Sequence, residues 1–160
     1  NFKEVQIELL GTFAISYLTM QARITDDMNN NVYAAQTAIV SIFATLAFIL
    51  IGFPTTKCHF SPIFTIADTI FRKNDVNGAI IAVLTQFIAT FLAVGFIVIG
   101  LTNRQVEGLI HKSYTGFPYL RDQFDSTSGF FAELIFSSAL VFVYLSFSEN
   151  KRGSKIWVEH

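Results

Sequence analysis

Four long apolar runs, separated by polar stretches, organise the chain. They cover residues 5–21, 32–53, 78–101 and 129–147. Each run is close to the roughly 20 residues that an α-helix needs to cross a bilayer. The pattern therefore predicts four transmembrane helices, and the polar stretch at residues 23–31 and the long connection at 102–128 are predicted to be loops.

A fifth, shorter helix is predicted between the second and third runs. Ser61 is a good helix N-cap, Pro62 suits the first helical position, and the apolar pattern ends near Arg72. Such a helix is too short to cross a bilayer, so it is either a soluble connector or a re-entrant half-helix with its N-terminus inside the membrane. The second alternative would present free backbone amides and a partial positive charge to a passing solute.

The basic residues predict the orientation in the membrane. Four spans and one re-entrant helix place both chain ends and the connection around residues 57–73 on one side. That side carries Lys3, Lys57, Arg72, Lys73, Lys151, Arg152 and Lys155, and the other carries Arg23, Arg104, Lys112 and Arg121. Because basic residues favour the inner side, both ends are predicted to be cytoplasmic, or on the matrix side of a mitochondrial inner membrane. The plasma membrane and organelle membranes remain alternatives.

The first and fourth runs share a pattern that indicates an inverted repeat. Residues 8–15 (ELLGTFAI) match residues 133–140 (ELIFSSAL) in the order acid, two aliphatics, hydroxyl, alanine and aliphatic. The predicted number of spans makes the two copies run in opposite directions. Inverted repeats in membrane proteins place the functional site near the midplane between the halves.

Composition excludes several classes of function. The chain is 52% hydrophobic and 14% charged, which is well below the roughly 25% charged residues of soluble domains. Its net charge of -1 provides no basic face for a nucleic acid. A single cysteine, Cys58, excludes an internal disulfide. No nucleophile–base pair, phosphate loop or metal-ligand spacing occurs in the sequence, so we expect no enzyme activity, no metal and no cofactor.

Taken together, these motifs resemble the aquaporin, or major intrinsic protein, family over the first four spans and the first half-helix of its fold. The matching residues are Glu8, Gly11, Thr12 and Phe13, the stretch 59–65 (HFSPIFT), Gln86, and the stretch 148–152 (SENKR). The resemblance implies an all-α membrane protein that is aquaporin-like, with four transmembrane helices plus one re-entrant half-helix. It implies a single domain over 1–160, with the first repeat at 1–101, a loop at 102–128 and the start of a second repeat at 129–160.

The resemblance also implies which residues serve a pore. His59, Ser61, Pro62 and Ile63 occupy the positions of the half-helix signature, whose usual Asn-Pro-Ala is Ser61-Pro62-Ile63 here. Serine reaches less far than asparagine and donates one hydrogen bond, and isoleucine adds bulk where two half-helices would meet. A second half-helix is not found, so the chain is expected to be a partial sequence, to be completed by another chain, or to be a degenerate relative.

Several polar residues are predicted to support this site. Glu8, Gln86 and Glu133 are expected in the protein interior, where the acids could form a proton pathway or, as we favour, hold a re-entrant segment through its amides. His59 could titrate or bind a metal, but a role in the pore wall or in capping fits better. Asp68 is expected to form a helix-surface pair with Arg72 four residues later.

Two functions follow as hypotheses. The first is a membrane channel for passive passage of water or small neutral solutes. The second is a non-conducting, aquaporin-derived structural subunit of a larger membrane complex, for example a mitochondrial one. The expected partners are the lipid bilayer, other protein chains or the second half of the fold, and further copies of the chain in a homo-oligomer; no nucleic acid is expected.

Overall fold

A computed structural model describes residues 2–28, 35–52, 58–72, 75–100 and 125–158, and within them it contains helices and no strand. The helices are α1 (Phe2–Met28), α2 (Ala35–Gly52), α3 (Pro62–Arg72), α4 (Val76–Gly100) and α6 (Ser126–Val158). The predicted all-α class is confirmed for the described part of the chain.

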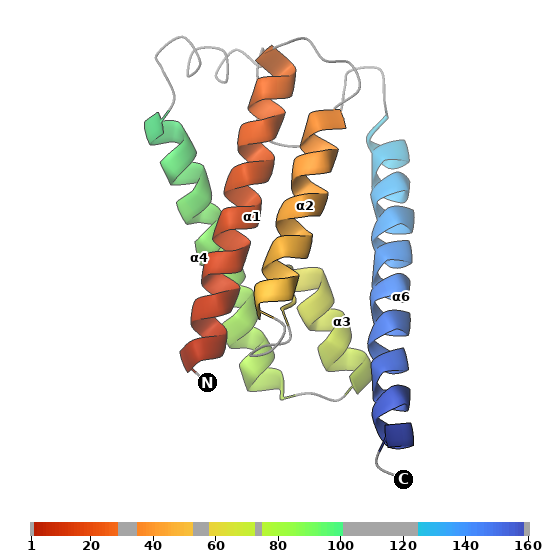
Figure 1. The fold of residues 1–160 in the computed structure, drawn as a ribbon. Coiled ribbons are helices and arrows are strands. Elements are labelled where there is room, and N and C mark those ends of the chain that lie inside the picture. The colour runs from red at the N-terminus through yellow and green to blue at the C-terminus, as the bar shows by residue number, and fades with distance from the viewer. Residues whose placement is uncertain (1, 29–34, 53–57, 73–74, 101–124, 159–160) are drawn as a thin grey trace.

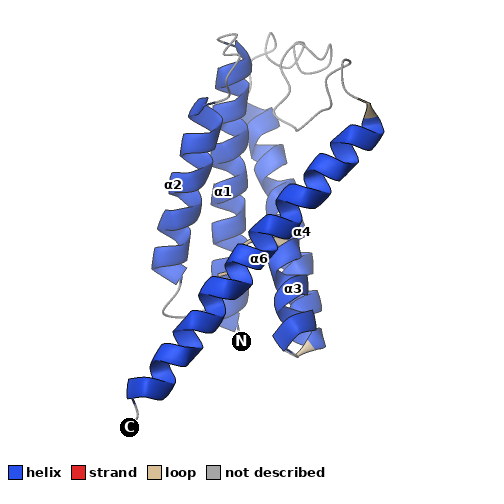
Figure 2. Cartoon of the chain, turned by 90° about the vertical axis from the view of Figure 1, so that its right-hand side faces the viewer, coloured by secondary structure: helices blue, strands red, loops and turns tan. Residues whose placement is uncertain are grey.

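Three helices run side by side and form the body of the molecule (Figure 1). α1 packs against both α2 and α4. The short helix α3 packs against α4 and against α6. Figure 2 shows that α6 is strongly tilted relative to α1, α2 and α4. α3 is therefore held between the body and the tilted C-terminal helix.

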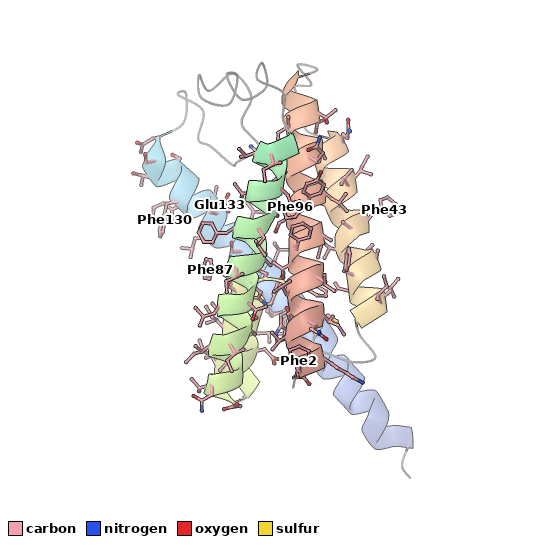
Figure 3. The ribbon with its side chains drawn as sticks, turned by 90° about the vertical axis from the view of Figure 1, so that its left-hand side faces the viewer. Phe2, Phe43, Phe87, Phe96, Phe130 and Glu133 are labelled. Atoms are coloured by element: carbon pink, nitrogen blue, oxygen red, sulfur yellow. The ribbon has the colours of Figure 1, made fainter. Side chains whose placement is uncertain are left out.

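The interior of this body is small and polar, whereas its outside is large and apolar. α4 buries Thr85, Gln86, Ala89, Ala93 and Ile97. It exposes bulky side chains such as Ile88 and Phe91. Figure 3 shows Phe43 and Phe130 pointing away from the body, and these side chains are 69% and 64% exposed. Small buried faces let membrane helices approach closely, and bulky apolar outsides suit lipid.

Two helical segments are long and apolar enough to cross a membrane by length and composition, among the described residues. They are Val76–Gly100 and Ser126–Ser146, with mean hydropathies of 2.4 and 1.8. α2 is apolar but falls just short at Gln36–Gly52. These segments coincide with three of the four predicted runs.

The polar stretch at 23–31, predicted to be a loop, is helical as far as Met28, so that prediction was wrong over its first part. The reason is a contact that the local pattern does not reveal. Asp26 is 2% exposed, and its Oδ2 accepts hydrogen bonds from the backbone N–H of Thr37 at 2.8 Å and from its hydroxyl at 2.7 Å. Because Thr37 lies in the first turn of α2, Asp26 satisfies an amide that the helix itself leaves unpaired.

The outer boundaries of the last helix also differ from the prediction. α6 begins at Ser126 and continues to Val158, so most of the polar tail that follows residue 147 is helical. The predicted loop at 102–128 lies largely outside the described residues, which resume at residue 125.

Candidate functional site at the start of α3

The three residues before Ser61 form a tight loop, and the amides of two of them converge on one carboxylate. Glu8 of α1 is 5% exposed, and its Oε1 accepts a hydrogen bond from the His59 N–H at 2.9 Å. Its Oε2 accepts one from the Phe60 N–H at 3.0 Å. Such converging amides form an anion-binding concavity, here filled by a side chain of the same chain.

The loop needs this support because its backbone is strained. Cys58 and Phe60 have φ angles of 51° and 49°, in the left-handed region that non-glycine residues seldom adopt. A residue held in such a conformation costs about 1–3 kcal/mol and persists only when its surroundings impose it. The two hydrogen bonds to Glu8 fasten the strained segment to α1.

Two glycines allow the loop to lie so close to the helices. A Cβ atom on Gly11 of α1 would collide with the Phe60 ring, and one on Gly52 of α2 would collide with the Cys58 sulfur. No real Cβ atom tolerates such contacts. The absence of a side chain at these two positions therefore creates the recess that receives the loop.

Gln86 of α4 connects the loop to the helix that follows it. Its Nε2 donates to Glu8 Oε2 at 3.0 Å and to Thr65 Oγ1 at 3.0 Å. The Thr65 hydroxyl in turn donates to the carbonyl of Ser61 at 3.2 Å. Gln86 is 1% exposed and Thr65 2% exposed, so this network is fully inside the protein. It ties α1, α3 and α4 together at one point.

The first turn of α3 has hydrogen-bond donors that find no acceptor among the residues that the structure describes. Ser61 occupies the cap position, since its carbonyl accepts from the Thr65 N–H at 3.2 Å, and α3 extends from Pro62 to Arg72 as predicted. The expected capping bond to the Ser61 hydroxyl is absent among the described residues. The N–H groups of Ile63 and Phe64 likewise find no acceptor there. A helix N-terminus with unpaired amides attracts electron-rich groups.

The side chains around this first turn differ in exposure. Ser61 and Pro62 are half-buried, and Ile63 is 42% exposed. His59 is 9% exposed, so its ring lies inside the protein next to the start of α3. The four predicted half-helix residues thus lie together, with the bulky Ile63 pointing outward.

Asp68 is buried, and the prediction that it lies on the helix surface was wrong. It is 2% exposed, and its Oδ2 lies 3.6 Å from His59 Nε2. The helical spacing from Asp68 to Arg72 suggested a pair on one face, but α3 turns that face toward the loop and α6. The side chain of Arg72 lies outside the described part of the structure.

Glu133 does not occupy the interior position expected for it. It is exposed on α6 (Figure 3) and makes no hydrogen bond to a described residue. The physical reason is that α6 packs against α3 through the other part of its length, where the Tyr144 ring contacts Phe64 at a centroid distance of 4.9 Å. The part that carries Glu133 presents apolar side chains such as Leu134, Ile135 and Phe136, which are 49–71% exposed.

The sequence singled out Glu8, Gln86 and the half-helix residues as a candidate site, but it did not indicate two residues that lie against them in the structure. Thr65 was noted only as part of a motif, although its position four residues after Ser61 places both on one helical face. The pairing of His59 with Asp68 had no local signal, because it depends on how the loop folds back over α3.

One comparison with known proteins identifies a family. The family model described as Major intrinsic protein matches residues 1–156, which is nearly the whole chain. No curated protein and no solved structure matches the chain significantly.

Proposed function

The chain belongs to the major intrinsic protein family, and on this premise we propose that it forms part of a membrane channel for passive passage of water or small neutral solutes. Members of this family are integral membrane channels, and the two long apolar helical segments agree with a membrane location. The observation that carries the proposal is the set of donors at the start of α3 that have no acceptor in the described part of the chain.

In this proposal α3 is a re-entrant half-helix, and Ser61 lies at its deep end. The Ser61 hydroxyl and the N–H groups of Ile63 and Phe64 are available to replace hydrogen bonds that a solute loses on leaving water. The positive end of the helix opposes the passage of cations and protons. Glu8 and Gln86 do not contact the solute; they fix the loop and therefore the direction of these donors.

Two residues at the start of α3 differ from the family signature and favour a second candidate function. Ser61 provides one hydroxyl where family members have a side-chain amide, so its side chain can donate only one hydrogen bond to a solute. Ile63 adds apolar bulk beside the donors and is 42% exposed. These two residues support the second candidate, a non-conducting structural subunit of a membrane complex, in which the loop and α3 persist as scaffold.

Other protein is proposed to cover α6 and the Ser61 end. Glu133 is exposed within an apolar helical segment, and a carboxylate facing lipid is strongly unfavourable. Lipid also cannot pair the free amides of α3. Protein that donates hydrogen bonds to Glu133 and accepts them from the amides of α3 would remove both costs. Further copies of the chain or unrelated subunits could supply it. Both chain ends are proposed to lie on the cytoplasmic or matrix side.

Osmotic shrinkage of vesicles tests the proposal. Proteoliposomes with residues 1–160 alone should shrink at the rate of protein-free vesicles, because the donors at Ser61 lack their covering protein. Membrane vesicles from cells that express the protein from its own gene should shrink faster, and Ser61→Trp should abolish the difference. An exposed outward residue, Phe43, provides the control: Phe43→Trp should leave the rate unchanged.

The outcomes separate the two candidates. Rapid shrinkage that Ser61→Trp does not change would contradict a path past Ser61. Background shrinkage in the expressing cells, for water and for small neutral solutes such as glycerol and urea, would overturn the channel proposal and favour the structural subunit.

A further inference from the structure

An apolar groove runs along the surface of the molecule between α3 and the first turns of α4, two helices that pack against each other (Figure 1). Its volume is about 340 Å³. Its floor consists of half-buried side chains, namely Thr69 of α3 and Ala79 and Val83 of α4. Its rim consists of exposed aliphatic side chains such as Ile70 and Leu84. The groove is therefore an accessible concave site, lined mainly by hydrocarbon.

The lining of the groove restricts the chemistry of what can occupy it. The Thr69 hydroxyl already donates to the carbonyl of Thr65 at 2.7 Å, and the other lining side chains are hydrocarbon. A bound water molecule needs two to four polar partners, so the groove does not suit water. A charged or polar ligand would lose hydration there without gaining hydrogen bonds. An uncharged hydrocarbon group is the ligand that matches these walls.

The groove is continuous with the part of α4 that faces lipid. Beyond Leu84, the exposed side of α4 continues with Phe87 and Phe91 (Figure 3). α4 is one of the two helical segments with the length and hydropathy of a membrane span, and the family is integral to membranes. An empty groove would deprive its walls of dispersion contacts. The hydrocarbon at hand to fill it is that of the bilayer.

The length and position of the groove match one leaflet of a bilayer. Exposed Asp75 caps α4 by accepting hydrogen bonds from the N–H groups of Asn77 at 3.2 Å and Gly78 at 3.0 Å. A carboxylate belongs at the water interface, so the groove starts there. From Val76 to Leu84 it extends about 12 Å along α4. The hydrocarbon layer of one leaflet is about 15 Å deep, so the groove spans most of that depth.

A further transmembrane helix fits the groove less well than a single hydrocarbon chain does. A helix with its side chains is about 10–12 Å across, so 12 Å of it occupies about 1,000 Å³, roughly three times the volume of the groove. Membrane helices also approach each other through small residues. Here the small Ala79 lies on the floor, and bulkier side chains such as Ile70 and Leu84 form the rim.

We propose that one acyl chain of a bilayer phospholipid lies in this groove, with its headgroup at the Val76 end and its terminal methyl group toward Leu84. The chain contacts Thr69 of α3 and Ala79 of α4 at the same time, and it supports the side of α3 that carries Ile70. This inference goes beyond the proposed channel function. It rests on the membrane location of the protein and not on conduction, so the outcome of the vesicle assay does not affect it.

Nuclear magnetic resonance in phospholipid nanodiscs tests the contact directly. The full chain is deuterated except at its methyl groups, and transfer of magnetisation from lipid chain protons to these methyl groups is measured. The Ala79 and Thr69 methyl groups should receive it, whereas the fully buried Ala93 should not. Lipids with deuterated chains should abolish the transfer. A wild-type protein without transfer from lipid to Ala79 and Thr69 would overturn the proposal.

The orientation of the lipid is tested in the same sample. Phospholipids whose chains are deuterated only in the half next to the headgroup should remove the transfer to the Val76 methyl groups and keep the transfer to Leu84. The opposite result would overturn the proposed direction of the chain.

A substitution that fills the groove separates a bound chain from lipid that merely passes over the surface. Ala79→Phe places a ring on the floor and should abolish transfer from lipid to the Thr69 methyl group on the facing helix. Val98→Phe is the control, because it also introduces a ring on α4, but at an exposed position outside the groove, and it should leave this transfer unchanged. Undiminished transfer to Thr69 in Ala79→Phe would show that the chain does not lie in the groove.

Discussion

Replacing Glu8 by glutamine changes one atom at the centre of the site, and its effect can be worked out bond by bond. Oε1 accepts from His59, whereas Oε2 accepts from both Phe60 and Gln86. A glutamine can keep only one acceptor oxygen. In the more favourable of its two orientations, the glutamine places this oxygen at the Oε2 position and keeps the bonds from Phe60 and Gln86. Its NH₂ group then points at the N–H of His59, and two donors face each other.

The expected loss of stability follows from these contacts. One buried N–H is left unpaired, which costs about 1–3 kcal/mol. The two remaining bonds lose their charge assistance, at about 1 kcal/mol each. Removing a buried charge recovers part of its desolvation, so we expect a net loss of about 2–4 kcal/mol for Glu8→Gln. That is a large share of the roughly 5–15 kcal/mol by which proteins are stable.

Denaturant unfolding in mixed micelles, followed by circular dichroism, measures this loss. Asp125→Asn is the control, since it also replaces a carboxylate by an amide, but at an exposed residue before the apolar segment of α6. It should change the free energy of unfolding by less than about 0.5 kcal/mol. The reasoning fails if Glu8→Gln is as stable as the wild type, or if the two substitutions cost the same.

Four further substitutions, one of them a control, can be measured in the same unfolding assay. Gly11→Ala places a methyl group against the Phe60 ring and should lower the free energy of unfolding by about 1–3 kcal/mol. The control is Gly95→Ala, which has open space around it and should have no effect or stabilise α4. Equal effects of the two substitutions would contradict the close approach of the loop to α1. Asp26→Ala removes the acceptor for the first turn of α2 and should cost about 0.5–2 kcal/mol. The buried Thr12 hydroxyl has no partner among the described residues, so Thr12→Val should raise the free energy of unfolding by about 1 kcal/mol. A lower free energy of unfolding would show that the hydroxyl is hydrogen-bonded.

Local patterns predicted the parts of the fold that depend on neighbours in sequence. The limits of α3 followed from Ser61-Pro62 at its start and the change of composition near Arg72. The spacing of Gln86, Ala89 and Ala93 marked the packed face of α4, and all three are buried. A charged or amide residue within an apolar run indicated Glu8 and Gln86 as interior groups, and both are buried.

The errors concern residues whose surroundings come from distant segments. Asp68 has a basic residue one turn later, which suggested a surface pair, but the loop that carries His59 folds back over it. Asp26 lies in a polar stretch, yet α2 supplies donors that bury it. Glu133 repeats the pattern of Glu8, but α6 contacts α3 elsewhere along its length. No rule based on spacing contains this information.

The central claim is that α3 enters the membrane with Ser61 at its deep end. Spin labels at two exposed positions of α3 can test it, Ile63→Cys near the start and Phe71→Cys near the end, both in a Cys58→Ser background. Eight residues of helix separate the labels by about 12 Å along the axis.

The depth of each label in lipid bilayers is measured by its collision rates with oxygen, which dissolves in lipid, and with a nickel chelate, which stays in water. If α3 is re-entrant, the label at 63 should lie deeper than the label at 71 by roughly 10 Å, most of that axial separation. Equal depths, with both labels near the water interface, would mean that α3 lies on the surface and would contradict the account.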